Sequence, residues 1–163
     1  MHFSAFLAAT AAVLASASPM PISSIAAAEV DKIWNVTGWE AGCSRSGCYA
    51  GFAVSAPAST GNPAAPALNA TCRIENEGGA YSPCEWKGDE PAAGRRVVSR
   101  LLPAIRVDGE NTIARFEVSF VYPHGTTPGA YYNWTAQGNS SYNQAVEPPK
   151  NFAIPVTKIF GIA

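Results

Sequence analysis

Apolar and polar residues alternate in several short stretches of this chain, the pattern typical of half-buried β-strands. The first stretch, IWNVTGW over 33–39, puts Trp34 and Val36 on one face and Asn35 and Thr37 on the other. We expect a strand here whose tryptophan and valine face a core.

The strongest hairpin signal is Asp108-Gly109, a dipeptide typical of a tight type I′ turn. It separates AIRV, residues 104–107, from a run in which every second residue is apolar. The pattern predicts Phe116, Val118, Phe120 and Tyr122 facing inward, and Arg115, Glu117 and Ser119 facing outward. An antiparallel sheet with one wet face follows.

Shorter strand signals cover 49–54, 70–74, 131–136 and 152–159, and no segment keeps a helical period beyond two turns. Pro155 interrupts the last strand and should lie at an edge or a bulge. We predict a mainly β protein, a single-domain antiparallel β-barrel, with a β-sandwich as the alternative.

The first 17 residues have the form of a secretory signal peptide. An uncharged apolar run is followed by Ala15-Ser16-Ala17, small residues suited to signal peptidase. The run is shorter than the roughly 20 residues that a membrane-spanning helix needs. We expect a flexible segment over 18–29, a single β domain over 30–163 that includes 55–69 as a long loop, and a secreted, extracellular protein.

The charge pattern points away from polyanionic partners. The formal net charge is −1 and the basic residues are scattered, so we expect neither nucleic acid nor a membrane as partner. Arg95-Arg96 is the only local basic pair, and a solvated strand end accounts for it.

Four cysteines in an exported chain predict disulfides. Three pairings are possible, and we favour Cys43 with Cys48 and Cys72 with Cys84, whose short loops are worth about 2 and about 3 kcal/mol in the chain-entropy model. The alternative, a zinc site, would need an unusual ligand spacing without a nearby histidine. The same compartment suits four N-glycosylation sequons, at Asn35, Asn69, Asn133 and Asn139.

Catalytic and cofactor motifs are missing from the sequence, so we predict no catalytic residues, no metal and no cofactor. His124 lies in a Pro/Gly turn without a visible nucleophile, which indicates a solvated loop histidine. Two alternatives stay open. Glu75, Glu77, Glu85 and Asp89 could supply a carboxylate pair for glycoside hydrolysis, and Tyr131, Tyr132, Trp134 and Tyr142 could stack on sugars.

Four motifs resemble the Alternaria major-allergen family of secreted fungal proteins. They are W-x-V-T-x-W at 34–39, F-x-V at 52–54, Y-S-x-C at 81–84 and an alternating strand that ends in Y-P at 116–123. The resemblance spans about 30–123. It implies a compact β-barrel without catalytic machinery, known as an allergen and as an elicitor or effector that acts on plant defence, with plant defence proteins and flavonoid-type ligands bound by some members.

The resemblance carries over few residues. Cys72 and Cys84 match the family's first disulfide, and Trp34 matches its early core tryptophan. Cys43 and Cys48 have no counterpart, and the family's second disulfide and its dimer-linking N-terminal cysteine are missing. A covalent dimer is therefore not expected, and no ligand-binding residue can be transferred.

These observations predict a secreted, non-enzymatic fungal protein that acts by binding a host plant protein or a small aromatic ligand, as an effector or elicitor. The alternatives are a cell-wall-associated or carbohydrate-binding glycoprotein and, less favoured, a small hydrolase with a carboxylate pair.

Overall fold

The computed structural model describes residues 32–88, 93–103, 113–144 and 146–162. The predicted leader over 1–17, the segment over 18–29, AIRV, the Asp108-Gly109 turn and Asp89 lie outside these ranges. Of the predicted single domain over 30–163, the structure therefore describes only residues within 32–162.

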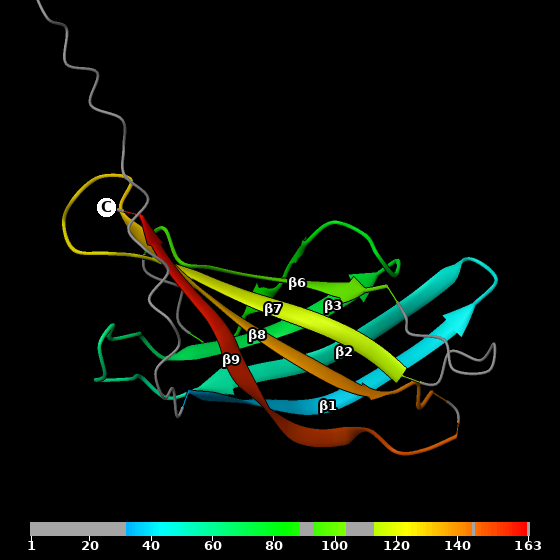
Figure 1. Cartoon of the computed structure of the whole chain (residues 1–163). Helices are drawn as coiled ribbons and strands as arrows, with labels where there is room; N and C mark the ends of the chain where they lie inside the picture. The colour runs from blue at the N-terminus through cyan, green and yellow to red at the C-terminus, as the bar shows by residue number, and fades with distance from the viewer. Residues whose placement is uncertain (1–31, 89–92, 104–112, 145, 163) are drawn as a thin grey trace, which may run out of the picture.

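Nine antiparallel strands form one continuous sheet that curls into a nearly closed barrel (Figure 1). The predicted mainly β class and the barrel are confirmed, and the sandwich alternative is not adopted. The strand order is β4-β6-β7-β8-β9-β1-β2-β3-β5. The strands are β1 Ile33–Ser44, β2 Gly47–Ala56, β3 Leu68–Glu75, β4 Ser82–Pro83, β5 Glu85–Trp86, β6 Arg96–Leu102, β7 Ile113–Pro123, β8 Tyr131–Ser141 and β9 Lys150–Ile162.

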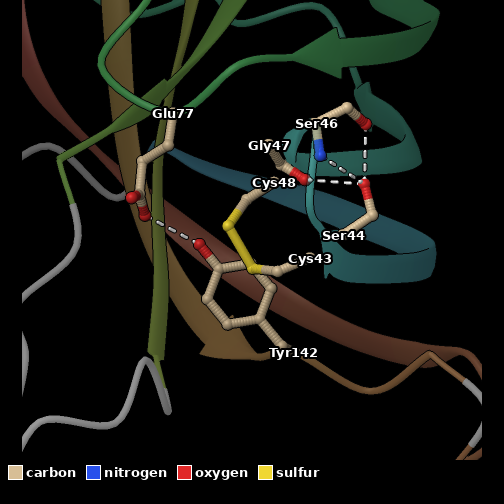
Figure 2. The surroundings of a disulfide bond; sticks show 7 residues. All are labelled: Cys43, Ser44, Ser46, Gly47, Cys48, Glu77 and Tyr142. Carbon is tan, nitrogen blue, oxygen red and sulfur yellow. Dashed lines mark hydrogen bonds between the residues drawn. A yellow bond between two sulfur atoms is a disulfide. The ribbon is translucent and has the colours of Figure 1, made fainter.

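The first disulfide lies at the tip of the β1–β2 hairpin. Cys43 and Cys48 face each other across the two strands, with their Cα atoms 3.9 Å apart. Ser44 still pairs with Gly47, so the loop between the two strands holds only two residues, Arg45 and Ser46. Figure 2 shows how the Ser44 hydroxyl accepts a hydrogen bond from the Ser46 amide and contacts the Ser46 hydroxyl at 2.7 Å. These bonds stabilise the tight turn.

A β-bulge in β1 turns Trp39 into the core. Strict alternation after Trp34 and Val36 would point Trp39 outward. The register shifts between Val36 and Trp39 on the β9 side, and Gly38 takes a φ of 66°, which glycine adopts without strain. Trp39 consequently has no exposed surface and stacks on Phe116, with ring centroids 4.6 Å apart.

Asn143 replaces β9 as the neighbour of β1 beyond the bulge. The last pair between these two strands is Trp39 with Lys150. Past it, the buried Asn143 side chain accepts from the Ala41 amide at 2.9 Å and donates to the Trp39 carbonyl at 3.0 Å. It also donates to the Pro148 carbonyl. One amide side chain thus satisfies backbone groups that no strand reaches.

The last two strands are longer than predicted. β8 runs five residues beyond Ala136, to Ser141, and Gly138 in this extension faces the interior of the barrel. A Cβ on Gly138 would lie 2.6 Å from both Phe116 and Ile154, so glycine is needed there for close packing. Pro155 lies next to the bulged end of the β8–β9 ladder, whose last pair is Ala136 with Val156. On its other side Pro155 pairs with Ile33 of β1, so the proline lies inside a central strand next to a register shift.

A short segment closes the barrel between β3 and β6, which face each other across the remaining gap. Its first part, β4, pairs with β6, and the Cys84 amide donates to the Val97 carbonyl at 2.9 Å. Its second part, β5, pairs with β3. The Cys72–Cys84 disulfide, with Cα atoms 4.3 Å apart, fixes the crossing point to β3. Both edges of the sheet are thereby covered.

This arrangement predicts unequal roles for the two disulfides. Replacing Cys72 and Cys84 together by alanine should lower the free energy of unfolding by about 3 kcal/mol, and the same change at Cys43 and Cys48 by about 2 kcal/mol. Urea denaturation followed by tryptophan fluorescence measures both. A larger loss from the hairpin pair would contradict the closing role of Cys72–Cys84.

Candidate functional site

The loop over 57–67, between β2 and β3, folds across one end of the barrel. Figure 1 places this loop at the same end as the β7–β8 loop and the C-terminus, and the β1–β2 hairpin at the other. Ser59 and Ala65 exchange backbone hydrogen bonds of 2.8 and 3.0 Å within it. The Lys32 ammonium donates to the Pro63 carbonyl at 3.0 Å, and the Tyr122 hydroxyl donates to the Ala64 carbonyl at 2.9 Å. The loop is thus attached to the barrel on two sides.

A cavity of about 310 Å³ lies between this loop and the barrel. We call it the end pocket. Its principal walls are Lys32, Trp34, Ser59, Leu68, Phe120 and Trp134. Alternation along β1, β7 and β8 brings the two tryptophans and the phenylalanine to the inside of the sheet. The inner wall of the pocket is therefore aromatic, while Lys32, Ser59 and Thr60 add polar groups to the lining. The volume lies at the lower end of the range for small-molecule sites.

Two polar groups interrupt the apolar wall of the end pocket. The Trp134 indole N–H is buried and finds no acceptor among the described residues. The Lys32 ammonium lies 3.6 Å from the centre of the Trp134 ring, a cation–π contact. Burial lowers the pKa of Lys32 from its ordinary value. An unpaired buried donor costs about 1–3 kcal/mol, so this site would gain from an acceptor.

A second hollow lies on the other side of the loop, beside Tyr122, His124 and Tyr132. His124 is exposed, and its ring stacks near that of Tyr132 at 4.5 Å. Burial raises the pKa of the Tyr122 phenol well above its usual value. The described residues that line this hollow include no serine, threonine or cysteine, so no nucleophile is placed beside His124.

Both predicted cysteine pairs are disulfides, and none of the four sulfurs is free. They are not available as zinc ligands, because a thiolate is required for that role. Over the described ranges, no group of three or more histidine, cysteine or acidic side chains could hold a metal ion.

The predicted carboxylates have separate surroundings. Glu75 lies 3.5 Å from Arg73 in an exposed ion pair, and Glu77 accepts a hydrogen bond from the Tyr142 hydroxyl at 2.8 Å (Figure 2). Burial and this bond raise the pKa of Tyr142. Glu85 is exposed on β5, and Asp89 lies outside the described residues.

The sequence pattern missed Glu117, the most buried carboxylate among the described residues. It points outward as predicted, but the face is not wet there, because Tyr81, Arg100 and Gln137 cover it and leave 7% exposed. The Tyr81 hydroxyl donates to it at 2.9 Å and the Arg100 Nε at 2.7 Å. Desolvation alone would raise the pKa of Glu117, but the hydrogen bonds from Arg100, Tyr81 and Gln137 outweigh it, and the pKa is lowered.

The sequon asparagines lie at four positions on three strands. Asn35 on β1, Asn69 on β3 and Asn139 on β8 are exposed. Asn133 on β8 is half-buried and accepts a hydrogen bond from the Ser119 hydroxyl at 3.0 Å. Glycosylation stays a prediction at all four.

The aromatic residues proposed for sugar stacking do not form one surface. Trp134 is buried in the barrel, and Tyr142 packs against the core. Tyr132 lies against Tyr122 and His124, while Tyr131 packs on Phe160 on the outside. Their closeness in sequence therefore does not produce a stacking platform.

Comparison with known proteins found no matching family model, curated protein or solved structure. Among the described residues, none belongs to a helix with the length and hydropathy required to cross a bilayer.

The Glu117 cluster predicts a pH dependence of stability. A lowered pKa in the folded state means that ionised Glu117 stabilises the fold above the unfolded pKa of about 4.3, and that this contribution is lost as the pH falls through the lower, folded-state pKa. Glu117→Gln should therefore destabilise the protein by about 1–3 kcal/mol at pH 7. The deficit should shrink toward pH 3, as measured by urea denaturation at several pH values.

The matched control is Glu75→Gln, which removes an exposed carboxylate and should change stability by less than about 1 kcal/mol. A deficit of Glu117→Gln that stays constant from pH 7 to pH 3 would contradict the assignment.

Proposed function

We propose that this chain is an exported, non-catalytic protein that acts by binding, and that the end pocket holds a small aromatic ligand. One observation carries the proposal: a cavity with an inner wall of Trp34, Phe120 and Trp134 has an ammonium group, that of Lys32, over one of these rings. Export is supported by the apolar leader pattern and by the two disulfides.

The groups that line the end pocket suit binding better than catalysis. Its described walls contain no histidine, cysteine or carboxylate. The Lys32 ammonium already holds the Pro63 carbonyl and the Trp134 ring. Acid–base chemistry would need a further group to exchange a proton with the substrate.

The walls define the chemistry of the ligand. Trp34, Phe120 and Leu68 favour a flat apolar body, while Lys32 and the Trp134 N–H favour an acceptor oxygen or a carboxylate at one end. A volume of about 310 Å³ restricts the ligand to a compact molecule. A phenylpropanoid acid has these properties, so 4-hydroxycinnamate is a suitable probe.

Titration with 4-hydroxycinnamate should perturb the indole N–H resonance of Trp134 in a nitrogen–proton correlation spectrum. Lys32→Met should weaken binding about tenfold or more, because a hydrogen bond to a charged group is worth about 1.5–3 kcal/mol. For the uncharged analogue 4-hydroxycinnamyl alcohol, the same substitution should reduce the affinity much less. Absence of any change at Trp134 with the wild-type protein, at millimolar probe, would remove the end pocket as a ligand site.

The proposal extends to an effector or elicitor role on plants, for which the motif resemblance is the support. Purified protein infiltrated into leaves should induce an oxidative burst or local cell death. The Lys32→Met variant shows whether the response needs the end pocket. Leaves of several plant species that give no response to the wild-type protein would contradict this role, while leaving the binding test untouched.

A further inference from the structure

Gly51 occupies an unexpected position in the middle of β2. A glycine inside a strand weakens it, and it usually marks a bulge, a bend or the close approach of another molecule. Gly51 pairs with Glu40 on β1 and with Arg73 on β3, and its pair with Glu40 is the first after the register shift of the β1–β2 ladder. A Cβ added there would meet nothing within 4 Å, and its φ is an ordinary one. Packing therefore does not require glycine here.

The missing side chain hollows the outer face of the barrel. A groove of about 500 Å³ runs over β1, β2 and β3 at this point. Gly51 and Ala53 form its floor, and Tyr49 stands at one end. The side chains around it are Thr37, Glu40, Thr71, Arg73 and Lys87. We call this hollow the outer groove.

The outer groove offers donors and acceptors in a mixture that suits a polyhydroxylated ligand. Glu40 on β1 and Arg73 on β3 lie in the same row as Gly51, and Arg73 also forms an exposed ion pair with Glu75. Thr37 and Thr71 line the groove between these charged residues. A carboxylate and two basic side chains thus flank a small apolar floor. This lining matches a neutral sugar, with its hydroxyl and acetamido groups, better than it matches an anion or a peptide strand.

Two sequons lie in register along the outer groove. Asn35 and Asn69 both pair with Ser55, so they occupy one row across β1, β2 and β3. Their threonines, Thr37 and Thr71, form the next row and line the groove itself. Neighbouring strands are about 4.8 Å apart, so the two asparagines, which are two strands apart, lie about 10 Å from each other. The groove begins at the next row of outward-facing residues, about 7 Å further along the strands.

We propose that the outer groove is a carbohydrate site whose occupant is the protein's own N-linked glycan, with the first sugars attached to Asn35 and Asn69 packed over Gly51 and against Tyr49. This inference rests on the proposed export of the chain, because N-linked glycans are attached in the secretory pathway. It does not depend on the end pocket. It accounts for the open space over Gly51 beside two sequons that lie in one row across β1, β2 and β3.

The test expresses the full chain in yeast behind a standard secretion leader, so that glycan attachment does not depend on residues 1–17. Glycopeptide mass spectrometry should find sugars on Asn35 and Asn69. Nuclear Overhauser contacts should connect acetamido methyl protons of the glycan to the Tyr49 ring. Unoccupied asparagines, or occupied ones without contacts to Tyr49, would overturn the proposal.

A thermodynamic cycle tests the packing of the sugars. Gly51→Trp fills the groove, and in the glycosylated protein it should lower Tm by about 3 °C by displacing the sugars. In the Asn35→Gln/Asn69→Gln background the same change should leave Tm unchanged or raise it, because an aromatic residue favours a strand more than glycine does. Equal effects in the two backgrounds would overturn the proposal.

Two matched controls isolate the groove. Lys158→Trp places a tryptophan on the exposed side of β9, away from the groove, and should act equally with and without the sugars. Asn139→Gln removes a sequon on β8 and should leave the effect of Gly51→Trp unchanged. If the Asn35→Gln/Asn69→Gln protein binds free chitobiose while the natural sites carry no sugar, the groove serves a foreign glycan and the proposed occupant is wrong. Any of these results leaves the 4-hydroxycinnamate titration of the end pocket unaffected.

Discussion

The closing of the sheet between β3 and β6 is the constraint on which the rest of this structure depends. An open nine-stranded sheet would expose two edges and half of its apolar face. The segment over 82–86 changes its pairing partner from β6 to β3 within five residues, and Cys72–Cys84 fixes it at the change. This closure lets Trp39, Phe52 and Phe116 meet in one interior, with ring centroids 4.6 to 5.4 Å apart.

Closure also decides where a ligand can be held. Large aromatic side chains fill the barrel, so the hollows lie at its end, under the 57–67 loop, and on its outer face, over Gly51. Among the described residues, the two buried side-chain polar atoms that have no partner belong to Trp134 and Thr71, one in the wall of each hollow. Elsewhere the buried polar groups are well satisfied, as at Asn143 and Glu117.

The two proposed sites differ in the ligands that they would hold. The end pocket combines apolar walls with a cation and suits a compact acidic aromatic molecule. The outer groove combines a hydroxyl, both charges and a small floor, and suits a sugar. The end pocket and the outer groove have no lining residue in common. Each site can therefore be altered by a substitution, at Lys32 or at Gly51, that leaves the other unchanged.

The sequence by itself determined the local features. Period-two alternation predicted the buried side chains of Trp34 and Val36 on β1 and of Phe116, Val118, Phe120 and Tyr122 on β7. Cysteine spacing favoured, among three pairings, the two disulfides that form. Each of these features depends on residues a few positions apart. Only the tertiary structure decided that Trp39 turns inward at the Gly38 bulge, that Glu117 is covered by Tyr81 and Arg100, and that Trp134 lines a pocket rather than a sugar platform. Each of these depends on strands distant in sequence, and their relative placement is set by closure of the barrel, which no local pattern encodes.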